Sequence, residues 1–258
     1  MEVQLIDHMG SDASIVQAAR VSYGQGTKTV SEDRHLIRYL MRNWHTTPFE
    51  MVEFKFRIKV PIFVARQWLR HRTASVNEVS ARYSEVSNEY WVPTNYRAQS
   101  SANKQGSGEF MNDITSHPQE HSSEIAFDVY DGLLSKGVSR ELARVHLPQS
   151  TFTEFYWKIN LHNLFHFLRL RMDSHAQQEI REPAMKVFEL IKSIVPDACQ
   201  AFLDYRMNSV SLSGPDIRAI KTGDFSELSS REKNELLDKC RLLGLMACTT
   251  KVDASTSS

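Results

Sequence analysis

The sequence predicts an α+β fold in which helices pack against an antiparallel sheet. Residues 52–60 alternate strictly between apolar and charged side chains, as expected for an antiparallel strand with one face in the core and one in solvent. A second run, 151–159, is rich in β-branched and aromatic residues and predicts another strand. Most of the remaining segments carry apolar residues at helical spacing. These patterns indicate few strands and many helices.

The composition limits the classes of function. The 31 basic and 31 acidic residues balance, which argues against bulk binding to nucleic acid or to a membrane surface, so any anion site must be local. The longest apolar runs fall far short of the roughly 20 residues that a membrane span needs, and the N-terminus lacks the layout of a secretory signal. The three cysteines lie late and match no zinc or CxxC spacing, which indicates free thiols and a cytoplasmic location.

Two helices are expected before the first strand, at 11–21 and 31–44, and each begins at a serine that can cap it. A polar break at 45–50 separates the second helix from the strand. Pro61 ends the strand and suits the first turn of another helix, which extends to about Arg70.

The chain between the two strands is mostly polar at first. Residues 73–92 lack a helical period and predict a loop that runs into an extended segment, with a strand fragment at 90–92. The Ser-rich stretch 97–124 has little to bury and predicts a mobile surface loop. Two helices should follow, one at 123–136 ending before Gly137 and one from Ser139 to Leu147.

Helices also follow the second strand. Asn160 should begin a helix that reaches about Met172. The Ser-His-Ala-Gln pattern at 174–177 predicts a capping box and a further long helix, which Pro183 should kink or divide. A last core helix is expected at 197–207.

From residue 208 the character of the sequence changes. Residues 209–215 resemble a linker, 226–246 could form one amphipathic helix, and 249–258 form a polar tail. We therefore expect one domain at 1–207 and an appendage at 208–258.

The stretch Arg66–Glu85 concentrates four arginines, one histidine and two carboxylates in twenty positions. Arginine presents a planar fork of donors that suits phosphate and carboxylate groups. A solvated helix face is the alternative interpretation, but polar residues continue through Ser75, Asn77, Ser80 and Arg82, beyond any helix. Ligand binding, with a nucleotide as the ligand, is the better interpretation.

Several known motifs are absent from the sequence. No Gly-x-Gly-x-x-Gly follows a strand and no Walker pattern occurs, so arginines and helix N-termini must hold any nucleotide. His162 and His166 have the spacing of a metal pair, but no Glu or Cys completes the site, and we expect no metal. They fit a polar helix face that lines a ligand pocket. Ser80 is the nearest candidate nucleophile; since no base is evident beside it, a hydrogen bond to a ligand is its simpler role.

The segment Arg70–Ser80, an Arg-His-Arg followed seven residues later by Ser, resembles the signature of the flavin-dependent thymidylate synthases. Its flanks, Pro61–Trp68 and Ala81–Ser84, are also similar to that family. Further similar segments are Ala19–Ser22, Asp33–Ile37, His45–Glu50, Ala143–Arg144, the helix from Asn160 to Arg171, and Asp173–Gln177. The resemblance covers roughly residues 10–207 in order.

The resemblance implies reductive methylation of dUMP to dTMP, with methylenetetrahydrofolate as the carbon donor and FAD as the carrier of hydride from NADPH. No cysteine nucleophile is expected, because the chemistry would rest on reduced flavin while the protein supplies position and electrostatics. The family is built on a twisted, mostly antiparallel sheet packed with long helices. It also forms homotetramers whose active sites are each assembled from more than one subunit.

Carried over position by position, the resemblance assigns FAD binding to Thr47, Arg70, His71, Arg72, Glu78, Asn160, His162 and His166. It assigns dUMP binding to Gln67, Arg70, Glu78, Ser80, Arg82, Arg144 and Arg171. The candidate catalytic residues are Arg171 and Ser80. Arg171 would lie against the uracil edge, where a fixed cation favours ionised N3 and so activates C5; Ser80 would hold dUMP. The family more often has arginine at position 162, so His162 departs from its pattern.

Two other classes of function stay open. A module that binds RNA or DNA through the arginine cluster would show steep salt dependence, and the net charge of zero disfavours it. A flavin-free nucleotide-binding or phosphate-ester enzyme would be colourless. The expected partners are therefore dUMP, methylenetetrahydrofolate and NADPH, with no nucleic acid and no membrane.

Overall fold

The computed structural model describes residues 1–21, 30–100, 106–111 and 117–245. The chain separates into two compact units, Met1–Met207 and Asn208–Ser258. None of the described helices combines the length and the apolar character that crossing a bilayer requires.

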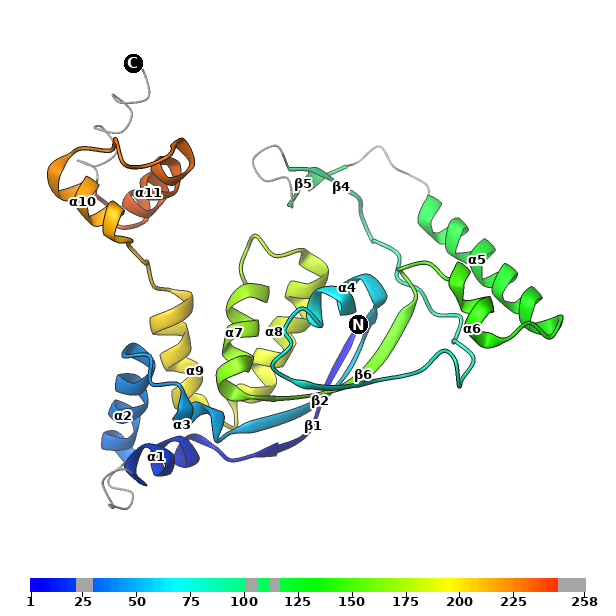
Figure 1. The fold of residues 1–258 in the computed structure, drawn as a ribbon, viewed down its shortest axis with the longest axis horizontal. Helices are drawn as coiled ribbons and strands as arrows, with labels where there is room; N and C mark the ends of the chain where they lie inside the picture. Colours follow the sequence, from blue (N-terminus) through cyan, green and yellow to red (C-terminus); the bar gives the residue numbers. More distant parts are fainter. Residues whose placement is uncertain (22–29, 101–105, 112–116, 246–258) are drawn as a thin grey trace. The chain divides into compact units, whose positions relative to one another are not determined.

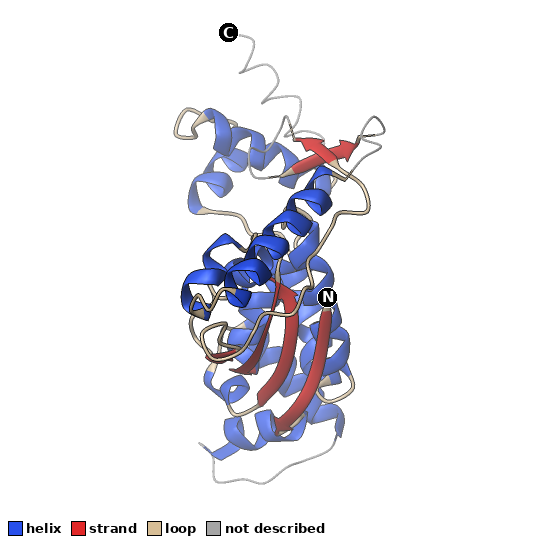
Figure 2. Ribbon diagram, turned by 90° about the vertical axis from the view of Figure 1, so that its right-hand side faces the viewer, coloured by secondary structure: helices blue, strands red, loops and turns tan. Residues whose placement is uncertain are grey.

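The first unit is built on a four-stranded sheet in which every neighbouring pair is antiparallel. Its strands, in spatial order, are β1 (Glu2–Met9), β2 (Glu53–Pro61), β6 (Phe152–Asn160) and β3 (Ser75–Glu78). The two predicted strands are β2 and β6, each shifted by one residue, and Figure 2 shows the long strands side by side. The predicted α+β fold with a mostly antiparallel sheet is confirmed.

Two strands of this sheet, β1 and β3, were not predicted. β1 lacks strict alternation, and β3 lies in the stretch that we interpreted as loop, where all four of its residues are exposed. Both pair with a strand far away in the sequence, β1 with β2 and β3 with β6. Such strands form because the partner offers free backbone groups, and their own side chains carry little signal.

Seven helices of this unit pack on the sheet or on one another, and Figure 1 shows α4, α7 and α8 on one side of the sheet. Their bounds are α1 (Asp12–Arg20), α2 (Val30–Arg42), α3 (Thr47–Glu50), α4 (Ile62–Trp68), α7 (Leu161–Arg171), α8 (Gln178–Lys192) and α9 (Pro196–Phe202). A short π-helical segment, η3 (Leu203–Met207), continues α9.

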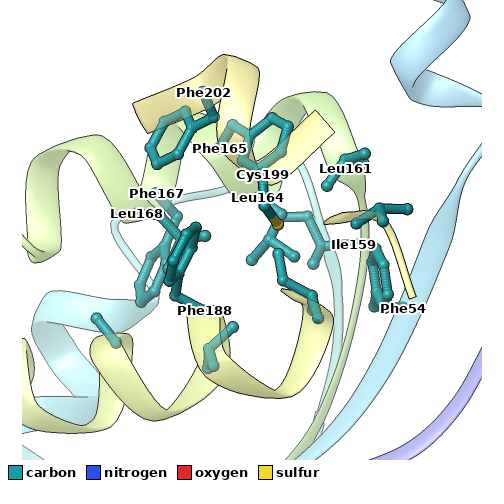
Figure 3. Packing of buried hydrophobic residues seen from close by; sticks show 14 of the residues in the cluster. Phe54, Ile159, Leu161, Leu164, Phe165, Phe167, Leu168, Phe188, Cys199 and Phe202 are labelled. Atoms are coloured by element: carbon teal, nitrogen blue, oxygen red, sulfur yellow. The ribbon is translucent and has the colours of Figure 1, made fainter. Parts of the chain in front are cut away.

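The core fills the space between the sheet and these helices. In Figure 3, Phe165 of α7 stacks on Phe202 of α9, with ring centroids 4.5 Å apart. Trp68 of α4 meets Trp157 of β6 edge to face at 5.2 Å, and both are fully buried. Aromatic pairs of this geometry add roughly 0.5–1.5 kcal/mol each beyond the area that they bury, so they fix α7 against α9 and α4 against the sheet.

A second cluster of buried residues lies under α5 (Pro118–Ser135), α6 (Arg140–Ala143) and the short 3₁₀ turn η2 (Arg144–His146). Gly137 has φ +80° directly after α5, as the predicted helix end requires. The predicted helix from Ser139 to Leu147 is wrong in its second half, because the chain tightens into η2.

The prediction of a loop over the whole of 97–124 is also wrong. The described part of this stretch contains a hairpin of β4 (Arg97–Gln99) and β5 (Ser107–Phe110), and α5 begins at Pro118. Arg97 anchors the hairpin through a 2.5 Å ion pair with the buried Glu179 of α8. Because Glu179 lies 82 residues from Arg97 in sequence, no local pattern predicts this ion pair or the hairpin that it holds.

Three predictions of helix ends need correction. α4 ends at Trp68 and not at Arg70. The capping box at 174–177 does not form: Gln177 precedes α8 without a side-chain cap, and Asp173 instead accepts from the backbone N–H of His175 at 2.8 Å. Pro183 lies inside α8 without dividing it. By contrast, Asn160 caps α7 as predicted, its side chain accepting from the N–H of Asn163.

The described part of the second unit, residues 208–245, holds two helices where we predicted one, α10 (Gly214–Thr222) and α11 (Ser230–Leu242). The Ser-Gly-Pro that we interpreted as linker starts α10, because Ser213 and Asp216 form a reciprocal capping box. The helices share a small buried cluster that includes Leu236 and Cys240. The predicted polar tail lies outside the described residues.

Candidate active site

The arginine cluster follows α4 into the turn before β3. Arg66, Arg70 and Arg72 are exposed, and none of their side chains pairs with an acid or donates a hydrogen bond among the described residues. Unpaired guanidinium groups gathered in one turn are donors available to an anion. The geometry therefore keeps Arg70 and Arg72 available for a phosphate.

Arg171, at the C-terminal end of α7, reaches back to this turn. Its Nε donates to Nε2 of His71 at 3.1 Å, and its Nη2 donates to the backbone carbonyl of Gln67, also at 3.1 Å. Burial lowers the pKa of Arg171, yet no carboxylate pairs with it in the described residues. A partly buried cation without a counterion is costly unless a ligand supplies the negative charge.

His71 is nearly enclosed, with 9% of its surface exposed. Burial, and then the charge of Arg171, lower the pKa of His71 to about 4. Since Nε2 accepts from Arg171, the ring is neutral and carries its proton on Nδ1. The ring also meets His166 edge to face at 5.6 Å, which joins this cluster to the next one.

A small pocket, here called the histidine pocket, opens between α2, α3, α7 and η3. It has a volume of about 90 Å³ and is lined by Leu40, Met41, Trp44, His45, Thr46, Phe49, His162, Phe165, His166, Arg169, Phe202 and Arg206. Pockets that enclose whole ligands hold roughly 300–1,000 Å³, so this pocket can hold one ring or one phosphate of a larger molecule. Burial lowers the pKa of His162, so this imidazole favours its neutral form.

Thr47 and Asn160 lie next to the histidine pocket without lining it. Thr47 is exposed at the start of α3. Oδ1 of Asn160 accepts from both the backbone and the side chain of Asn163, at 2.9 and 3.0 Å. The oxygen of Asn160 thus already serves the helix, and its amide group is the part available to a ligand.

A larger cavity of about 600 Å³, here called the Glu78 pocket, lies where β3 ends beside η2. Glu78, Ser80 and Arg144 all line it. Thr153 of β6, which is 7% exposed, donates from its hydroxyl to Glu78 Oε1 at 2.5 Å. Arg82 lies beside the cavity and pairs with Glu141 at 3.3 Å, where both side chains are more than half exposed.

The predicted dUMP residues therefore fall into two groups. Glu78, Ser80 and Arg144 line the Glu78 pocket, and Arg82 lies beside it. The other three predicted residues, Gln67, Arg70 and Arg171, do not line it. Gln67 instead donates to the side chain of Gln177 at 2.6 Å. A single chain does not bring the two groups into one cavity.

Sequence reasoning missed Thr153, Trp44 and Arg206. Thr153 could have been found, because it is a polar residue at a core-facing position of the strand β6. Trp44 and Arg206 carried no comparable pattern. Among the residues with defined positions, no group of three His, Cys, Asp or Glu side chains lies close enough to hold a metal ion.

Comparison with known proteins places this chain in a family. The family model of the thymidylate synthase complementing proteins (Thy1) matches residues 4–197. The flavin-dependent thymidylate synthase of Dictyostelium discoideum is 54% identical over 241 residues, which cover 90% of this chain and 79% of that protein. The enzyme of the same name from Thermus thermophilus is 53% identical over 220 residues, or 85% of this chain and 82% of the relative.

A solved structure is similar over most of its length. The UMP/dUMP methylase PolB from Streptomyces cacaoi, in a crystal structure with 5-Br dUMP, superposes with a TM-score of 0.74 at 35% identity. The match covers 81% of this chain and 97% of that one. The chain belongs to the flavin-dependent thymidylate synthase family.

Proposed function

We propose that this protein methylates dUMP to dTMP with FAD as its cofactor, methylenetetrahydrofolate as the carbon donor and NADPH as the source of hydride. Its curated relatives are flavin-dependent thymidylate synthases, and its structural neighbour is a dUMP methylase. The single observation that carries the proposal is Arg171, a partly buried cation with no carboxylate partner among the described residues.

The role of Arg171 follows from its surroundings. His71 and the carbonyl of Gln67 hold its Nε and Nη2, so the guanidinium is fixed before any ligand arrives. A preorganised cation stabilises negative charge that develops on a substrate, and in a site of low dielectric this effect is large. Placed at the uracil edge, Arg171 would favour ionised N3 and increase the electron density at C5.

The residues present fit FAD in part. Its pyrophosphate needs cations, which the unpaired Arg70 and Arg72 offer. Its rings need flat neighbours, which the neutral His71 and His162 and the adjacent ring of His166 offer. Bound FAD would supply the hydride transfer that no side chain can perform. Thr47, Asn160 and Glu78 would complete the hydrogen bonds to it.

The Glu78 pocket suits the nucleotide substrate. Arg144 and the hydroxyl of Ser80 can hold the phosphate, and Glu78 can accept from a ribose hydroxyl or a ring N–H. Arg82 can leave Glu141 for the phosphate at little cost, because an exposed ion pair is worth only about 0–1 kcal/mol.

The division of the dUMP residues between two places supports a shared site. We propose a homotetramer in which Gln67 and Arg171 of one subunit face the Glu78 pocket of another. Four large apolar side chains around that pocket are more than half exposed, namely Val79, Tyr83, Leu142 and Val145. An exposed apolar patch of this kind is typical of a protein–protein contact.

A cysteine nucleophile has no place in this mechanism. Cys199 is buried and lines neither pocket, and burial raises its pKa to about 12. Cys240 is buried in the cluster that α10 and α11 share. The free thiol of Cys199 agrees with the reducing cytoplasm, which we propose as the location.

The test begins with the purified protein. We expect it to be yellow with bound flavin, to bleach when NADPH is added without oxygen, and to form dTMP once dUMP and methylenetetrahydrofolate are present. A colourless protein that never takes up FAD would refute the proposal. If the protein instead binds RNA or DNA with an affinity that falls steeply with salt, the nucleic-acid alternative is favoured.

A further inference from the structure

Helix α2 ends in an unusual way, with a tryptophan in the left-handed conformation. The N–H of His45 donates to the carbonyl of Leu40 at 3.0 Å, and the N–H of Trp44 donates to the carbonyl of Met41 at 3.4 Å. This pair of bonds is the Schellman ending, whose left-handed position usually belongs to glycine. Trp44 occupies it with φ +63°, and no other non-glycine residue of the described chain has a positive φ.

A tryptophan in the left-handed region is strained by its Cβ, and glycine would serve this helix end better. Burial does not explain the choice either, because Trp44 is 63% exposed. Backbone strain that the fold does not require is concentrated at functional sites. The side chain of Trp44 therefore needs an explanation outside the helix.

Arg206 covers one face of the indole. Its guanidinium carbon lies 3.4 Å from the ring centroid of Trp44, and the guanidinium also donates to the carbonyls of Met41 and, at 3.2 Å, Tyr205. The segment that presents it, η3, is π-helical, a rare conformation often found at functional sites. Since one face of the ring is occupied and most of the ring is exposed, the other face is open to a partner.

The charge around the ring is positive. Among the described residues, Arg206 donates only to carbonyl oxygens, and Arg169, which lines the same pocket, forms no hydrogen bond or close ion pair. Burial and the charge of Arg169 lower the pKa of Arg206, because two cations lie close together at this pocket. An anionic group would relieve that repulsion.

We propose that Trp44 and Arg206 form a stacking platform, at the mouth of the histidine pocket, for the aromatic ring of an anionic co-substrate. The ligand chemistry is a flat aromatic ring joined to a carboxylate or phosphate, as in a reduced folate or a pyridine nucleotide. The ring lies on the open face of Trp44, and its anionic group meets Arg169 and Arg206. This inference rests on the proposed function and adds three residues to it, Trp44, Arg169 and Arg206.

The first experiment needs no turnover. Trp68 and Trp157 are fully buried and Trp91 is half-buried, so Trp44 supplies the water-exposed part of the tryptophan fluorescence. Folate and NADPH are titrated separately into the holoenzyme and into Trp44→Phe, with dUMP as the negative probe and correction for absorption by the ligands. We expect one of the two to quench the exposed emission of the wild type. If neither ligand quenches the emission of the wild type more than that of Trp44→Phe, the platform does not exist.

The second experiment separates binding from folding. Trp44→Gly and Trp44→Asn suit the left-handed backbone, so we expect both to unfold at or near the wild-type temperature and to keep full flavin content. We expect the KM of one co-substrate, the one that quenches, to rise about tenfold in both variants. The KM of dUMP should stay unchanged, and Trp44→Phe, which keeps a ring, should lie within about threefold of wild type.

Arg206→Gln should raise the KM of the same co-substrate. The proposal is overturned if the KM values stay unchanged in both Trp44→Gly and Trp44→Asn. It is also overturned if both variants lose flavin, which would assign Trp44 to the cofactor site. A lower unfolding temperature in both would overturn it as well, because Trp44 would then serve the fold. A wild-type protein that forms no dTMP refutes the proposed function instead, and the fluorescence titration still decides the platform.

Discussion

The Nε of Arg171 donates a 3.1 Å hydrogen bond to Nε2 of His71, across 100 residues of sequence. The bond requires a neutral His71, and the low pKa of that imidazole, about 4, provides it throughout the physiological range. A neutral acceptor orients the guanidinium without cancelling its charge. The full positive charge of Arg171 therefore stays available to a substrate.

Replacing Arg171 tests this arrangement. We expect Arg171→Ala to keep FAD but to lower the rate of dTMP formation by about 100- to 1,000-fold, the usual loss when a preorganised charge is removed from a transition state. Arg171→Lys keeps the charge but not the planar fork, so its rate should lie between those of the wild type and Arg171→Ala. Turnover is measured at saturating dUMP alongside flavin absorbance. Unchanged turnover in the alanine variant would remove Arg171 from catalysis.

The low pKa of His71 makes a prediction about stability and pH. An unfolded histidine has a pKa near 6.5 and His71 in the fold has one of about 4, so the unfolded state binds the extra proton between these values. The contribution of His71 is therefore fully present above pH 6.5 and is lost as the pH falls toward 4. His71→Gln does not titrate and can still accept from Arg171.

Urea denaturation of both proteins from pH 4 to 7.5 measures the difference. We expect the stability advantage of the wild type to shrink as the pH falls. Asp12 has the opposite effect, since burial raises its pKa to about 6, but it is common to both proteins and cancels in the comparison. A difference that does not depend on pH would contradict the assignment.

Asp12 should stabilise α9. Its two carboxylate oxygens accept from the backbone N–H groups of Asp197, at 2.8 Å, and Ala198, at 3.1 Å. Loss of such an N-terminal cap typically costs about 0.5–2 kcal/mol. We expect Asp12→Ala to lose stability within this range in chemical denaturation, whereas Asp128→Ala, at an exposed position of α5, should change it little. Equal effects would show that the cap contributes nothing specific.

Thr153 should position Glu78. The hydroxyl of Thr153 holds one carboxylate oxygen and leaves the other for the ligand. We expect Thr153→Val to raise the KM of dUMP about tenfold, because the valine loses the bond and lets the carboxylate rotate. Thr153→Ser keeps the hydroxyl and should stay near wild type. If serine and valine behave alike, the hydrogen bond has no role in binding.

Removal of the thiols should leave the chemistry intact. We expect the variant with Cys199, Cys240 and Cys248 all changed to alanine to form dTMP at the wild-type rate, measured well below its unfolding temperature. Some stability should be lost, because Cys199 and Cys240 fill buried positions. A folded, flavin-loaded variant without activity would show that a cysteine takes part.

Local patterns in the sequence determined several parts of this protein. Strict alternation places β2, whose even-numbered side chains from Phe54 to Val60 are all buried. The cap of α7 at Asn160 and the glycine after α5 are equally local, because each depends on one residue and the few that follow it. The Arg-His-Arg segment indicated an anion site for a similar reason, because arginine side chains carry hydrogen-bond donors whatever the fold.

The tertiary structure alone decided which of these groups meet. Arg171 reaches His71, Thr153 reaches Glu78 and Arg206 covers Trp44, each across at least 75 residues. No periodicity encodes such a pair, because the distance between its members is set by how strands and helices close on one another. Likewise, β3 and the hairpin of β4 and β5 form only where a distant partner holds them. The sequence therefore indicated the chemistry of the site, and the packing of β6, α7 and η3 gave that chemistry its geometry.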